Sequence, residues 1–427
     1  ETDPRKFHLP EAVVLPKDAQ EIAAVIKLAN TYDVPVTVRS GGTSLAGGAI
    51  PVCGGIVLLM ERLNKIIELN AEGMYMEVEA GVRTVDIQKY ANEAGFLYAG
   101  DPCSAESCLI GGNIATNAGG NKAVRYGVTR DQVYAVEVVT PTGEIVELGA
   151  RLKKKSTGYC LEQLIMGSEG TLGIITKATL KLLPLCPYKL DLLAIFTDLD
   201  KAVGLVPNLI KAGLNPTSVE FMDNAFVRSS SDYCELKLPH YEDGFYVIVT
   251  VETFNEDELE SKMEQLDEIC SASGATDVLE ADDRVWKLRR NCLESTRVLS
   301  LVSTSDDLVV PVDQIANCIR HLTRVAENYN FKLFTLAHAG DGNLHFQILK
   351  GEMSDEQWED EVSRFHAEAY PYVYSLGGRL SGEHGIGAKK VEAMEKYTEP
   401  VEMKMMKEIK RALDPKNILS PGKVFNA

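Results

Sequence analysis

Residues 334–349 read FTLAHAGDGNLHFQIL, which is two apolar runs around a cluster of Gly, Asp and Asn. This pattern is typical of two strands joined by a loop longer than a tight turn. On one straight strand, His338 and His345 would lie on opposite faces, because their separation is odd. A turn between them instead brings both imidazoles to the ends of the loop. The stretch therefore predicts a β-hairpin that presents two histidines side by side.

A second short stretch, residues 381–387, reads SGEHGIG and adds Glu383 and His384 on a Gly-rich loop. Two imidazoles make half of a four-ligand metal site, and a carboxylate is a suitable third ligand. Taken alone, the hairpin is equally consistent with a polar turn that contains incidental histidines. With the second loop added, a metal or catalytic site is the better interpretation.

Composition limits the class of protein. The 427 residues suggest two or three domains, and a hydrophobic content of 45% is ample for sizeable cores. The formal net charge of -18 argues against nucleic acid and anionic membranes as partners. The nine cysteines are scattered without a CxxC pair, which favours reduced thiols. No apolar run approaches the ~20 residues of a transmembrane helix. We expect a cytoplasmic location, with the mitochondrial matrix as the alternative in a eukaryote.

Three Gly-rich stretches occur in the first half of the chain, at residues 39–48, 109–120 and 167–173. Glycines allow successive backbone N–H groups to converge on anionic oxygens. The first stretch is followed by an apolar strand rather than a helix, so it is not a Rossmann fingerprint. By itself it is also consistent with a surface turn, and the second stretch with a tightly packed turn. Together the three stretches predict one extended cofactor groove.

The sequence changes character after Pro184 and Pro187. Strand-like runs then alternate with amphipathic helices, and glycine becomes sparse. We expect an α+β fold with one domain at residues 1–186 and a second, with an antiparallel sheet, at residues 187–390. A C-terminal helix over residues 391–413 and an ordered tail complete the chain at residue 427.

The motifs at residues 39–44, 110–120, 167–175, 338–345, 383–385 and 417–423 share one resemblance that spans nearly the whole chain. In this order they resemble the FAD-dependent D-2-hydroxy-acid dehydrogenases. That family includes D-lactate dehydrogenase, the catalytic subunit of glycolate oxidase and D-2-hydroxyglutarate dehydrogenase. The resemblance implies a two-subdomain FAD-binding domain of the vanillyl-alcohol oxidase and p-cresol methylhydroxylase type at residues 1–186. It also implies a cap domain for substrate and metal at residues 187–390, and a C-terminal segment that returns to the FAD domain.

The resemblance implies which residues hold FAD. The residues expected around the pyrophosphate are Arg39, Ser40, Gly41, Gly42, Thr43 and Ser44, and those expected around the ring and ribityl chain are Pro102, Ser107, Gly111, Gly112, Thr116, Asn117, Gly170 and Ile175. Covalent attachment in the superfamily uses a His or Cys, in one case a His in the first Gly-rich loop. Thr43 stands at that position, so we expect non-covalent FAD.

The resemblance also assigns His338, His345 and Glu383 as ligands of a divalent metal, His384 as the catalytic base and Arg289 as the clamp for the substrate carboxylate. Zinc is the first expectation, and Fe²⁺ and Mn²⁺ suit the same ligands. The metal would lower the pKa of the substrate hydroxyl, whose proton passes to His384 while the C2 hydride passes to FAD. Because adjacent side chains in an extended loop point different ways, we expect Glu383 and His384 to serve separate roles.

The substrate expectation rests on a departure from part of the family. Members that act on 2-hydroxyglutarate hold its second carboxylate with a Thr and a Lys, and Leu293 and Ser305 stand at those places. Neither side chain neutralises a buried carboxylate. We therefore expect oxidation of D-lactate to pyruvate, with glycolate and D-2-hydroxyglutarate as alternatives and the D configuration inferred from the family.

The sequence contains no nicotinamide fingerprint, so we expect reduced FAD to pass its electrons to a partner protein. Some relatives in anaerobes use an electron-transfer flavoprotein, and a quinone or an iron–sulfur subunit is the alternative. Two other functional classes stay open. One is a metallohydrolase, which leaves the Gly-rich stretches unexplained, and the other is a flavoprotein without catalytic activity.

Overall fold

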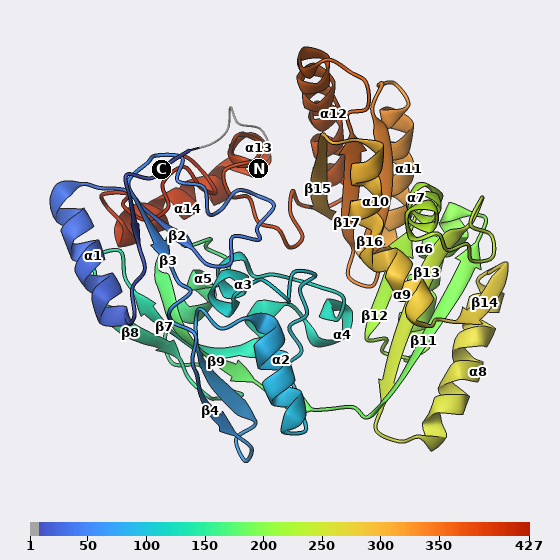
Figure 1. Ribbon diagram of the computed structural model, residues 1–427, viewed down its shortest axis with the longest axis horizontal. Coiled ribbons are helices and arrows are strands. Elements are labelled where there is room, and N and C mark those ends of the chain that lie inside the picture. The colour runs from blue at the N-terminus through green and yellow to red at the C-terminus, as the bar shows by residue number, and fades with distance from the viewer. Residues whose placement is uncertain (1–7) are drawn as a thin grey trace. The chain divides into compact units, whose positions relative to one another are not determined.

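The computed structural model describes residues 8–427, which form two compact units (Figure 1). The first unit comprises Glu1–Gly120, Tyr126–Leu185 and Glu383–Ala427, and the second Asn121–Arg125 and Cys186–Gly382. Residues 1–7 of the domain expected at 1–186 lie outside the described residues. The chain leaves the second unit at Gly382, whereas the sequence predicted this boundary at residue 390.

Within the described residues, the first unit contains three sheets. A parallel sheet has the order β1-β3-β2, an antiparallel sheet the order β4-β5-β9-β7-β8, and a small antiparallel sheet pairs β10 with β6. The strands are β1 (Ala12–Val14), β2 (Val36–Arg39), β3 (Ile56–Leu59), β4 (Ile66–Asn70), β5 (Tyr75–Glu79), β6 (Phe96–Leu97), β7 (Val133–Val139), β8 (Ile145–Gly149), β9 (Ile174–Lys181) and β10 (Leu183–Pro184).

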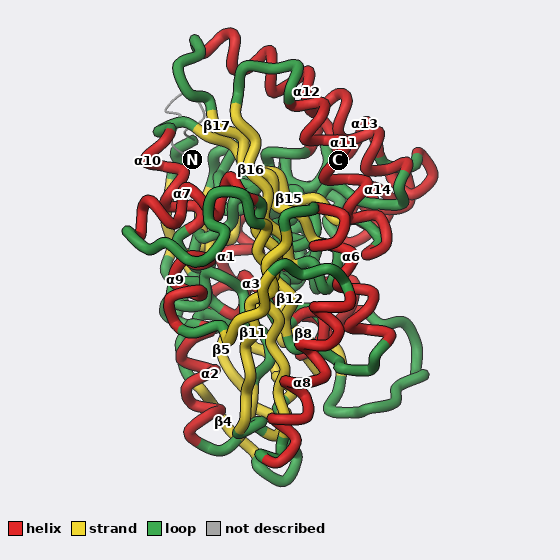
Figure 2. Tube along the Cα trace, turned by 90° about the vertical axis from the view of Figure 1, so that its right-hand side faces the viewer, coloured by secondary structure: helices red, strands yellow, loops and turns green. Residues whose placement is uncertain are grey.

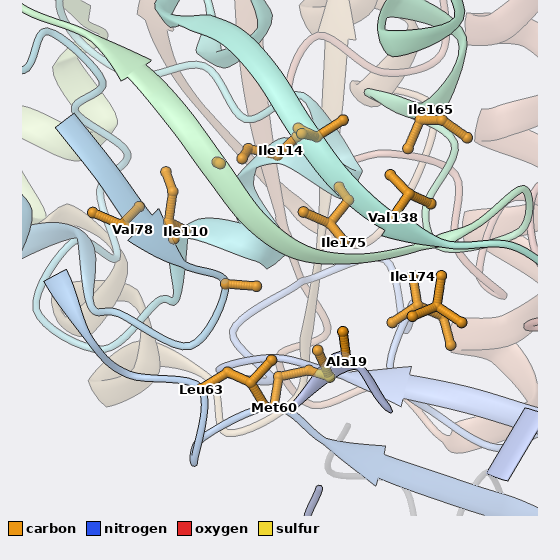
Figure 3. Close-up of a cluster of buried hydrophobic side chains, with 14 of the residues drawn as sticks. Ala19, Met60, Leu63, Val78, Ile110, Ile114, Val138, Ile165, Ile174 and Ile175 are labelled. Atoms are coloured by element: carbon orange, nitrogen blue, oxygen red, sulfur yellow. The ribbon is translucent and has the colours of Figure 1, made fainter. Parts of the chain in front are cut away.

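One apolar core joins these sheets to the helices α1 (Ala19–Tyr32), α2 (Thr84–Glu93), α3 (Ile110–Thr116) and α5 (Leu161–Ile165). Helix α1 begins where the Asp18 carboxylate accepts the Glu21 N–H at 2.8 Å, and it buries a helical stripe of apolar residues. Figure 3 shows the core side chains Ala19, Met60, Leu63, Val78, Ile110, Ile114, Val138, Ile165, Ile174 and Ile175. Because α3 contributes Ile110 and Ile114, its other side is available to line a site.

The prediction of one C-terminal helix over residues 391–413 is wrong. The segment forms two helices, α13 (Val391–Tyr397) and α14 (Pro400–Leu413). Pro400 disfavours helical backbone at the preceding residue and has no N–H to donate. The Glu399 carboxylate accepts the N–H groups of Val401 at 2.8 Å and Glu402 at 3.1 Å, so a new helix starts there.

The C-terminal tail returns to the parallel sheet. Ile418 accepts the Val36 N–H at 2.8 Å, and the Ser420 N–H donates to the Val36 carbonyl at 2.7 Å. The tail therefore lies along β2, directly before the first Gly-rich loop.

A buried ion pair anchors this tail. The Lys410 ammonium donates to Asp414 at 2.5 Å and to the carbonyls of Thr171 at 2.8 Å and Leu419 at 2.9 Å. Burial lowers the pKa of Lys410, and the contact with Asp414 opposes this shift. The Asp414 carboxylate also accepts the Leu419 N–H at 2.9 Å, so one pair fixes both α14 and the tail.

The second unit is built on a seven-stranded antiparallel sheet with the order β14-β11-β13-β12-β16-β17-β15. Its strands are β11 (Tyr188–Phe196), β12 (Ser218–Met222), β13 (Phe245–Thr253), β14 (Asp277–Glu280), β15 (Ser303–Val309), β16 (Lys332–His338) and β17 (Asn343–Leu349). Its helices are α6 (Leu199–Lys211), α7 (Asn224–Cys234), α8 (Asp257–Ala272), α9 (Asp283–Arg290), α10 (Cys292–Leu299), α11 (Ile315–Ala326) and α12 (Asp355–Ser375), and α4 (Ala123–Tyr126) crosses the unit boundary. None of the helices in residues 8–427 has both the length and the hydrophobicity that crossing a bilayer requires.

The predicted hairpin is confirmed. Strands β16 and β17 pair in register from Lys332↔Leu349 to His338↔Asn343, with the loop at residues 339–342 between them. Strands β15, β16 and β17 run side by side (Figure 2). One face of the sheet packs with α7 and α9 around Met222 and Leu336. This face carries the polar residues described below.

We predict that Lys410→Ala lowers the free energy of unfolding by about 3–5 kcal/mol, because it leaves the Asp414 charge buried without its cation. Urea denaturation followed by far-UV circular dichroism measures this loss. Lys404→Ala is the matched control on α14, since Lys404 is 72% exposed and pairs with Glu408 at 3.8 Å. Equal losses in the two variants would contradict the assigned role of the buried pair.

Candidate functional site

The first Gly-rich loop lies against the beginning of α3. The Gly112 N–H donates to Ser40 Oγ at 3.1 Å, and a Cβ built on Gly41 would lie 2.7 Å from the Ser107 carbonyl oxygen. Gly42 has a φ of 68°, which a residue with a side chain rarely adopts. Loop 40–44 therefore packs against residues 107–112 through backbone and the Ser40 side chain.

Loop 40–44 can accept an anionic ligand. In the part of the chain that the structure describes, no hydrogen bond engages the backbone N–H groups of Gly41, Gly42, Thr43 or Ser44. Gly42 is exposed and the other three are half-buried. Accessible N–H groups on consecutive residues suit the oxygens of a pyrophosphate.

Close backbone packing explains other glycines. A Cβ on Gly111 would lie 2.7 Å from the Ala80 Cβ, and the Gly111 N–H donates to the Ala80 carbonyl at 2.8 Å. Gly120 has a φ of 130°, and a Cβ there would collide with the Asp101 carbonyl. Close packing of the backbone, which the sequence analysis kept as an alternative, is therefore sufficient to explain why Gly111 and Gly120 are glycines.

The third Gly-rich stretch is attached to the end of α3. The Gly167 N–H donates to the Ile114 carbonyl at 3.0 Å, and the Glu169 N–H to the Ala115 carbonyl at 2.7 Å. All the residues predicted to contact FAD belong to the first unit and lie within or near the three Gly-rich stretches. Of these, Pro102, Gly111, Gly170 and Ile175 are buried, and Ile175 belongs to the apolar core in Figure 3.

Glu169 also supports the loop that carries Glu383 and His384. Its carboxylate accepts the N–H groups of Ile386 at 2.8 Å and Gly387 at 2.7 Å. Burial raises the pKa of Glu169, and these two hydrogen bonds oppose the shift. One residue thus joins the third Gly-rich stretch to the predicted catalytic loop, and the sequence analysis missed it.

The sequence predicted that the Glu383 and His384 side chains point in different directions, and this prediction is wrong. His384 Nε2 lies 3.6 Å from Glu383 Oε1. The Glu383 side chain is 11% exposed and that of His384 23%. The positive φ of Gly385, 80°, turns the backbone directly after His384, so the loop is bent rather than extended.

In the second unit, the two hairpin histidines lie next to each other. The centroids of the His338 and His345 rings are 5.2 Å apart, with the rings nearly perpendicular at 89°. His345 pairs with Leu336 across the hairpin and with Asp307 on β15. Because directly opposed residues share a face and alternate residues on a strand do so too, His338, His345 and Asp307 lie on the face covered by α7 and α9.

A fully buried carboxylate on the same face holds His338 and the predicted clamp. Glu220 Oε1 lies 2.8 Å from His338 Nδ1, and Oε2 accepts from Arg289 Nη2 at 2.6 Å and Nε at 3.1 Å. Burial opposes ionisation, but the contacts with His338 and Arg289 together hold the pKa of Glu220 below its ordinary value. The structure thus brings Arg289 and His338 together through a residue that the sequence analysis missed.

A second buried carboxylate lies beside His345. Asp307 Oδ1 accepts from Asn343 Nδ2 at 2.6 Å and is 4.0 Å from His345 Nδ1, while Oδ2 accepts from Ser381 Oγ at 2.5 Å and the Gly382 N–H at 3.1 Å. Glu383 is bonded directly to Gly382, and consecutive Cα atoms are about 3.8 Å apart. Asp307 therefore fixes the chain up to Gly382, the residue directly before Glu383.

The donor chemistry of these residues suits a metal. Two imidazoles and a carboxylate are usual ligands of Zn²⁺, Fe²⁺ or Mn²⁺. Glu220 engages Nδ1 of His338, and metal-ligating histidines use their second ring nitrogen in this way.

The remaining substrate residues are on neighbouring elements. Leu293 lies on α10 and is 43% exposed, and Ser305 lies on β15, half-buried, opposite Gln347.

Of the residues that the sequence analysis missed, Glu220 does have a signal in the sequence. Glu220 is a lone charge within an apolar strand, and a charge there needs a partner.

Two family models match the chain. Residues 10–149 match the FAD binding domain, and residues 189–424 match the C-terminal domain of FAD linked oxidases. A D-lactate dehydrogenase of Anaerostipes hadrus is 36% identical, with 97% of this chain and 89% of the relative covered. The glycolate oxidase subunit GlcD of Bacillus subtilis is 35% identical, with 99% and 90% covered.

The fold matches p-cresol methylhydroxylase with substrate bound, at a TM-score of 0.82, 18% identity, and coverage of 97% of this chain and 88% of that chain. This likeness confirms the predicted α+β fold, in which an FAD-binding domain of the p-cresol methylhydroxylase type is followed by a domain with an antiparallel sheet. The relatives give no support to the metallohydrolase alternative.

We predict that Glu169→Ala accelerates hydrogen exchange at the Ile386 and Gly387 amides by about 10–100-fold. Hydrogen bonds to a carboxylate contribute about 1.5–3 kcal/mol, and the variant removes both acceptor oxygens. Exchange measured by mass spectrometry of the 383–387 peptide tests this. Glu162→Ala is the control, because Glu162 is a buried carboxylate of the same unit that pairs with Lys155 instead. Unchanged exchange of this peptide in Glu169→Ala would show that Glu169 does not stabilise the loop that carries Glu383 and His384.

Proposed function

This chain belongs to the FAD-linked oxidase family, and we propose that within it the protein is a metal-dependent dehydrogenase of small D-2-hydroxy acids, with D-lactate as substrate and pyruvate as product. One observation carries the proposal. The buried Glu220 carboxylate holds both a histidine suited to a metal and an arginine suited to a carboxylate. A 2-hydroxy acid offers a hydroxyl to the metal that His338 would hold and a carboxylate to Arg289.

FAD is held non-covalently in this proposal. The backbone N–H groups of residues 41–44 bind the pyrophosphate, and residues 107–117 and 170–175 line the rest of the cofactor. Thr43 offers no nucleophile of the His or Cys kind for a covalent link. When bound, FAD supplies the acceptor for the C2 hydride of the substrate.

His338, His345 and Glu383 are the proposed ligands of a divalent metal, with zinc as the first candidate and Fe²⁺ or Mn²⁺ as alternatives. When bound, the metal lowers the pKa of the substrate hydroxyl. The carboxylate of Glu220 fixes Nδ1 of His338, so Nε2 carries the lone pair for the ligand bond.

His384 is the proposed base, and Arg289 the proposed clamp. His384 takes the hydroxyl proton of the substrate, and its partial exposure allows that proton to leave to solvent. The Arg289 guanidinium binds the substrate carboxylate and so orients C2. In this proposal, His384 and Arg289 supply proton transfer and substrate orientation, and the three ligands position the metal.

The second candidate substrates, glycolate and D-2-hydroxyglutarate, differ from D-lactate in one contact each. Glycolate lacks the methyl group. D-2-hydroxyglutarate adds a carboxylate, which neither Leu293 nor Ser305 neutralises, and an unpaired buried charge costs several kcal/mol.

The proposed electron acceptor is an electron-transfer flavoprotein, with a quinone or an iron–sulfur subunit as the alternative. The sequence has no nicotinamide fingerprint, so the electrons must pass from reduced FAD to another molecule. The acidic net charge of -18 favours a partner with a basic docking surface.

We predict that His338→Ala loses about 10³-fold in turnover but retains FAD, because the metal ligands and the flavin loops are different residues. Metal catalysis of this kind is worth several kcal/mol. Turnover and the ratio of flavin to protein absorbance are the measurements. His366→Ala is the control, since His366 pairs with Asp306 at 2.7 Å in the same unit and is not a proposed ligand. Normal turnover of His338→Ala in chelator-treated buffer would refute the metal role.

For the substrate, we predict the highest kcat/KM for D-lactate. Glycolate should lose roughly 10-fold for its missing methyl, worth about 1 kcal/mol. D-2-Hydroxyglutarate should lose more than 100-fold, since the unpaired carboxylate costs several kcal/mol. One preparation assayed with D-lactate, L-lactate, glycolate and D-2-hydroxyglutarate gives the comparison. A preference for the dicarboxylate would show that the Leu293 and Ser305 argument is mistaken.

For the acceptor, we predict that D-lactate oxidation is at least 10-fold faster with an electron-transfer flavoprotein than with a soluble quinone analogue, because a docked protein partner brings its flavin to a fixed position. Stopped-flow reoxidation of the reduced enzyme by each acceptor measures this. Rapid reoxidation by quinone alone would overturn the choice of acceptor.

A further inference from the structure

Glu220 occupies an unusual position for a charged side chain. It lies in the middle of β12, the central strand of the seven-stranded sheet, and its side chain is 0% exposed. Its neighbours Val219 and Phe221 are buried too. A carboxylate in such surroundings requires cations or N–H donors close by.

Glu220 meets this requirement with one partner for each oxygen. Oε1 is 2.8 Å from His338 Nδ1, and Oε2 is 2.6 Å from Arg289 Nη2. His338 comes from the neighbouring strand β16, directly opposite Glu220, and Arg289 comes from α9 on the same face (Figure 1). The carboxylate is therefore the physical link between the two partners.

The contact fixes the tautomer of His338. An ionised carboxylate only accepts hydrogen bonds, so Nδ1 of His338 must carry the hydrogen. The imidazole lone pair is then on Nε2, and the ring cannot rotate without breaking the bond to Glu220. Glu220 thus decides which nitrogen His338 presents.

The contact also fixes the plane of Arg289. A guanidinium has five N–H donors, and Glu220 takes the edge formed by Nε and Nη2. This pairing therefore sets the orientation of the remaining N–H groups of the Arg289 guanidinium. A bidentate carboxylate needs such a preset plane.

We propose that Glu220 is a positioning residue shared by the metal ligand His338 and the substrate clamp Arg289, so that metal affinity and carboxylate affinity both depend on it. The inference rests on the proposed function, because it assigns a ligand role to His338 and a clamp role to Arg289. It goes further by making one buried side chain the common support of both. The competing explanation is a purely structural ion pair that attaches α9 to the sheet.

The test is Glu220→Gln in the holoenzyme, with Glu220→Asp as the variant to measure if the first does not fold. Asp306→Asn is the matched control. Asp306 is also a buried carboxylate that pairs with a histidine, His366 Nε2 at 2.7 Å, but its partners are His366 and Tyr370. The measurements are the Kd for Zn²⁺ by competition with a chelator, the KM for D-lactate, and the FAD content.

We expect Glu220→Gln to weaken Zn²⁺ binding by about 10–100-fold, because the neutral amide has one acceptor oxygen instead of two, opposes Arg289 with a donor, and no longer raises the basicity of the His338 imidazole. The KM for D-lactate should rise at least 10-fold, while FAD content stays at the level of the unmodified protein. Asp306→Asn should change neither constant by more than about 2-fold. Non-additive KM effects of Glu220→Gln and Arg289→Met, combined in one double variant, would show that Glu220 acts through Arg289.

Several results would overturn the inference. Zn²⁺ affinity and KM unchanged in Glu220→Gln would do so, as would a change in only one of the two constants. Equal changes in Asp306→Asn would identify a general loosening of the unit instead. If the unmodified protein binds no divalent metal, the proposed metal function falls together with the inference. Metal binding that persists at full strength in Glu220→Gln removes the inference alone.

Discussion

A buried carboxylate is stable as an anion only when its partners compensate for the lost water, and Glu220 imposes this constraint on the centre of the second unit. His338 and Arg289 are those partners, one on each oxygen. Their positions are consequently set by the sheet rather than by loops. In the proposed function, this preset imidazole nitrogen and guanidinium plane recognise the hydroxy acid, so one buried charge supports both contacts.

Buried carboxylates also order the loop at residues 381–387. Asp307 accepts from Ser381 Oγ and the Gly382 N–H and so ties the segment before Glu383 to β15. Glu169 accepts the N–H groups of Ile386 and Gly387 and ties the segment after His384 to the third Gly-rich stretch. The short loop with the two proposed functional residues is therefore held at both ends by carboxylates. Glycines give it the backbone freedom to bend, and the carboxylates remove that freedom in the folded protein.

The hairpin could be predicted because its signal is local, since the strand pattern and the Gly, Asp and Asn of the turn all lie within residues 334–349. Helix α3 could not, because residues 110–116 contain poor helix formers and the helix depends on tertiary burial of Ile110 and Ile114. The break before α14 does have a local signal, because Pro400 disfavours helical backbone at Glu399. Glu220 carries only a weak local signal, because its partners lie 69 and 118 residues away in the sequence. Directly after the bend at Gly385, the Ile386 and Gly387 N–H groups donate to Glu169, a contact that no local pattern encodes.

In the proposed function, reduction of the flavin requires both the hydroxy acid and the metal. Anaerobic addition of D-lactate to the purified protein, followed by visible absorption spectroscopy, tests this requirement. We expect the flavin absorption to be bleached in the metal-loaded protein, to persist in the chelator-stripped protein, and to be bleached again once Zn²⁺ or Mn²⁺ is restored. Bleaching at the same rate with and without metal, or a metal-loaded flavin that no 2-hydroxy acid reduces, would contradict it.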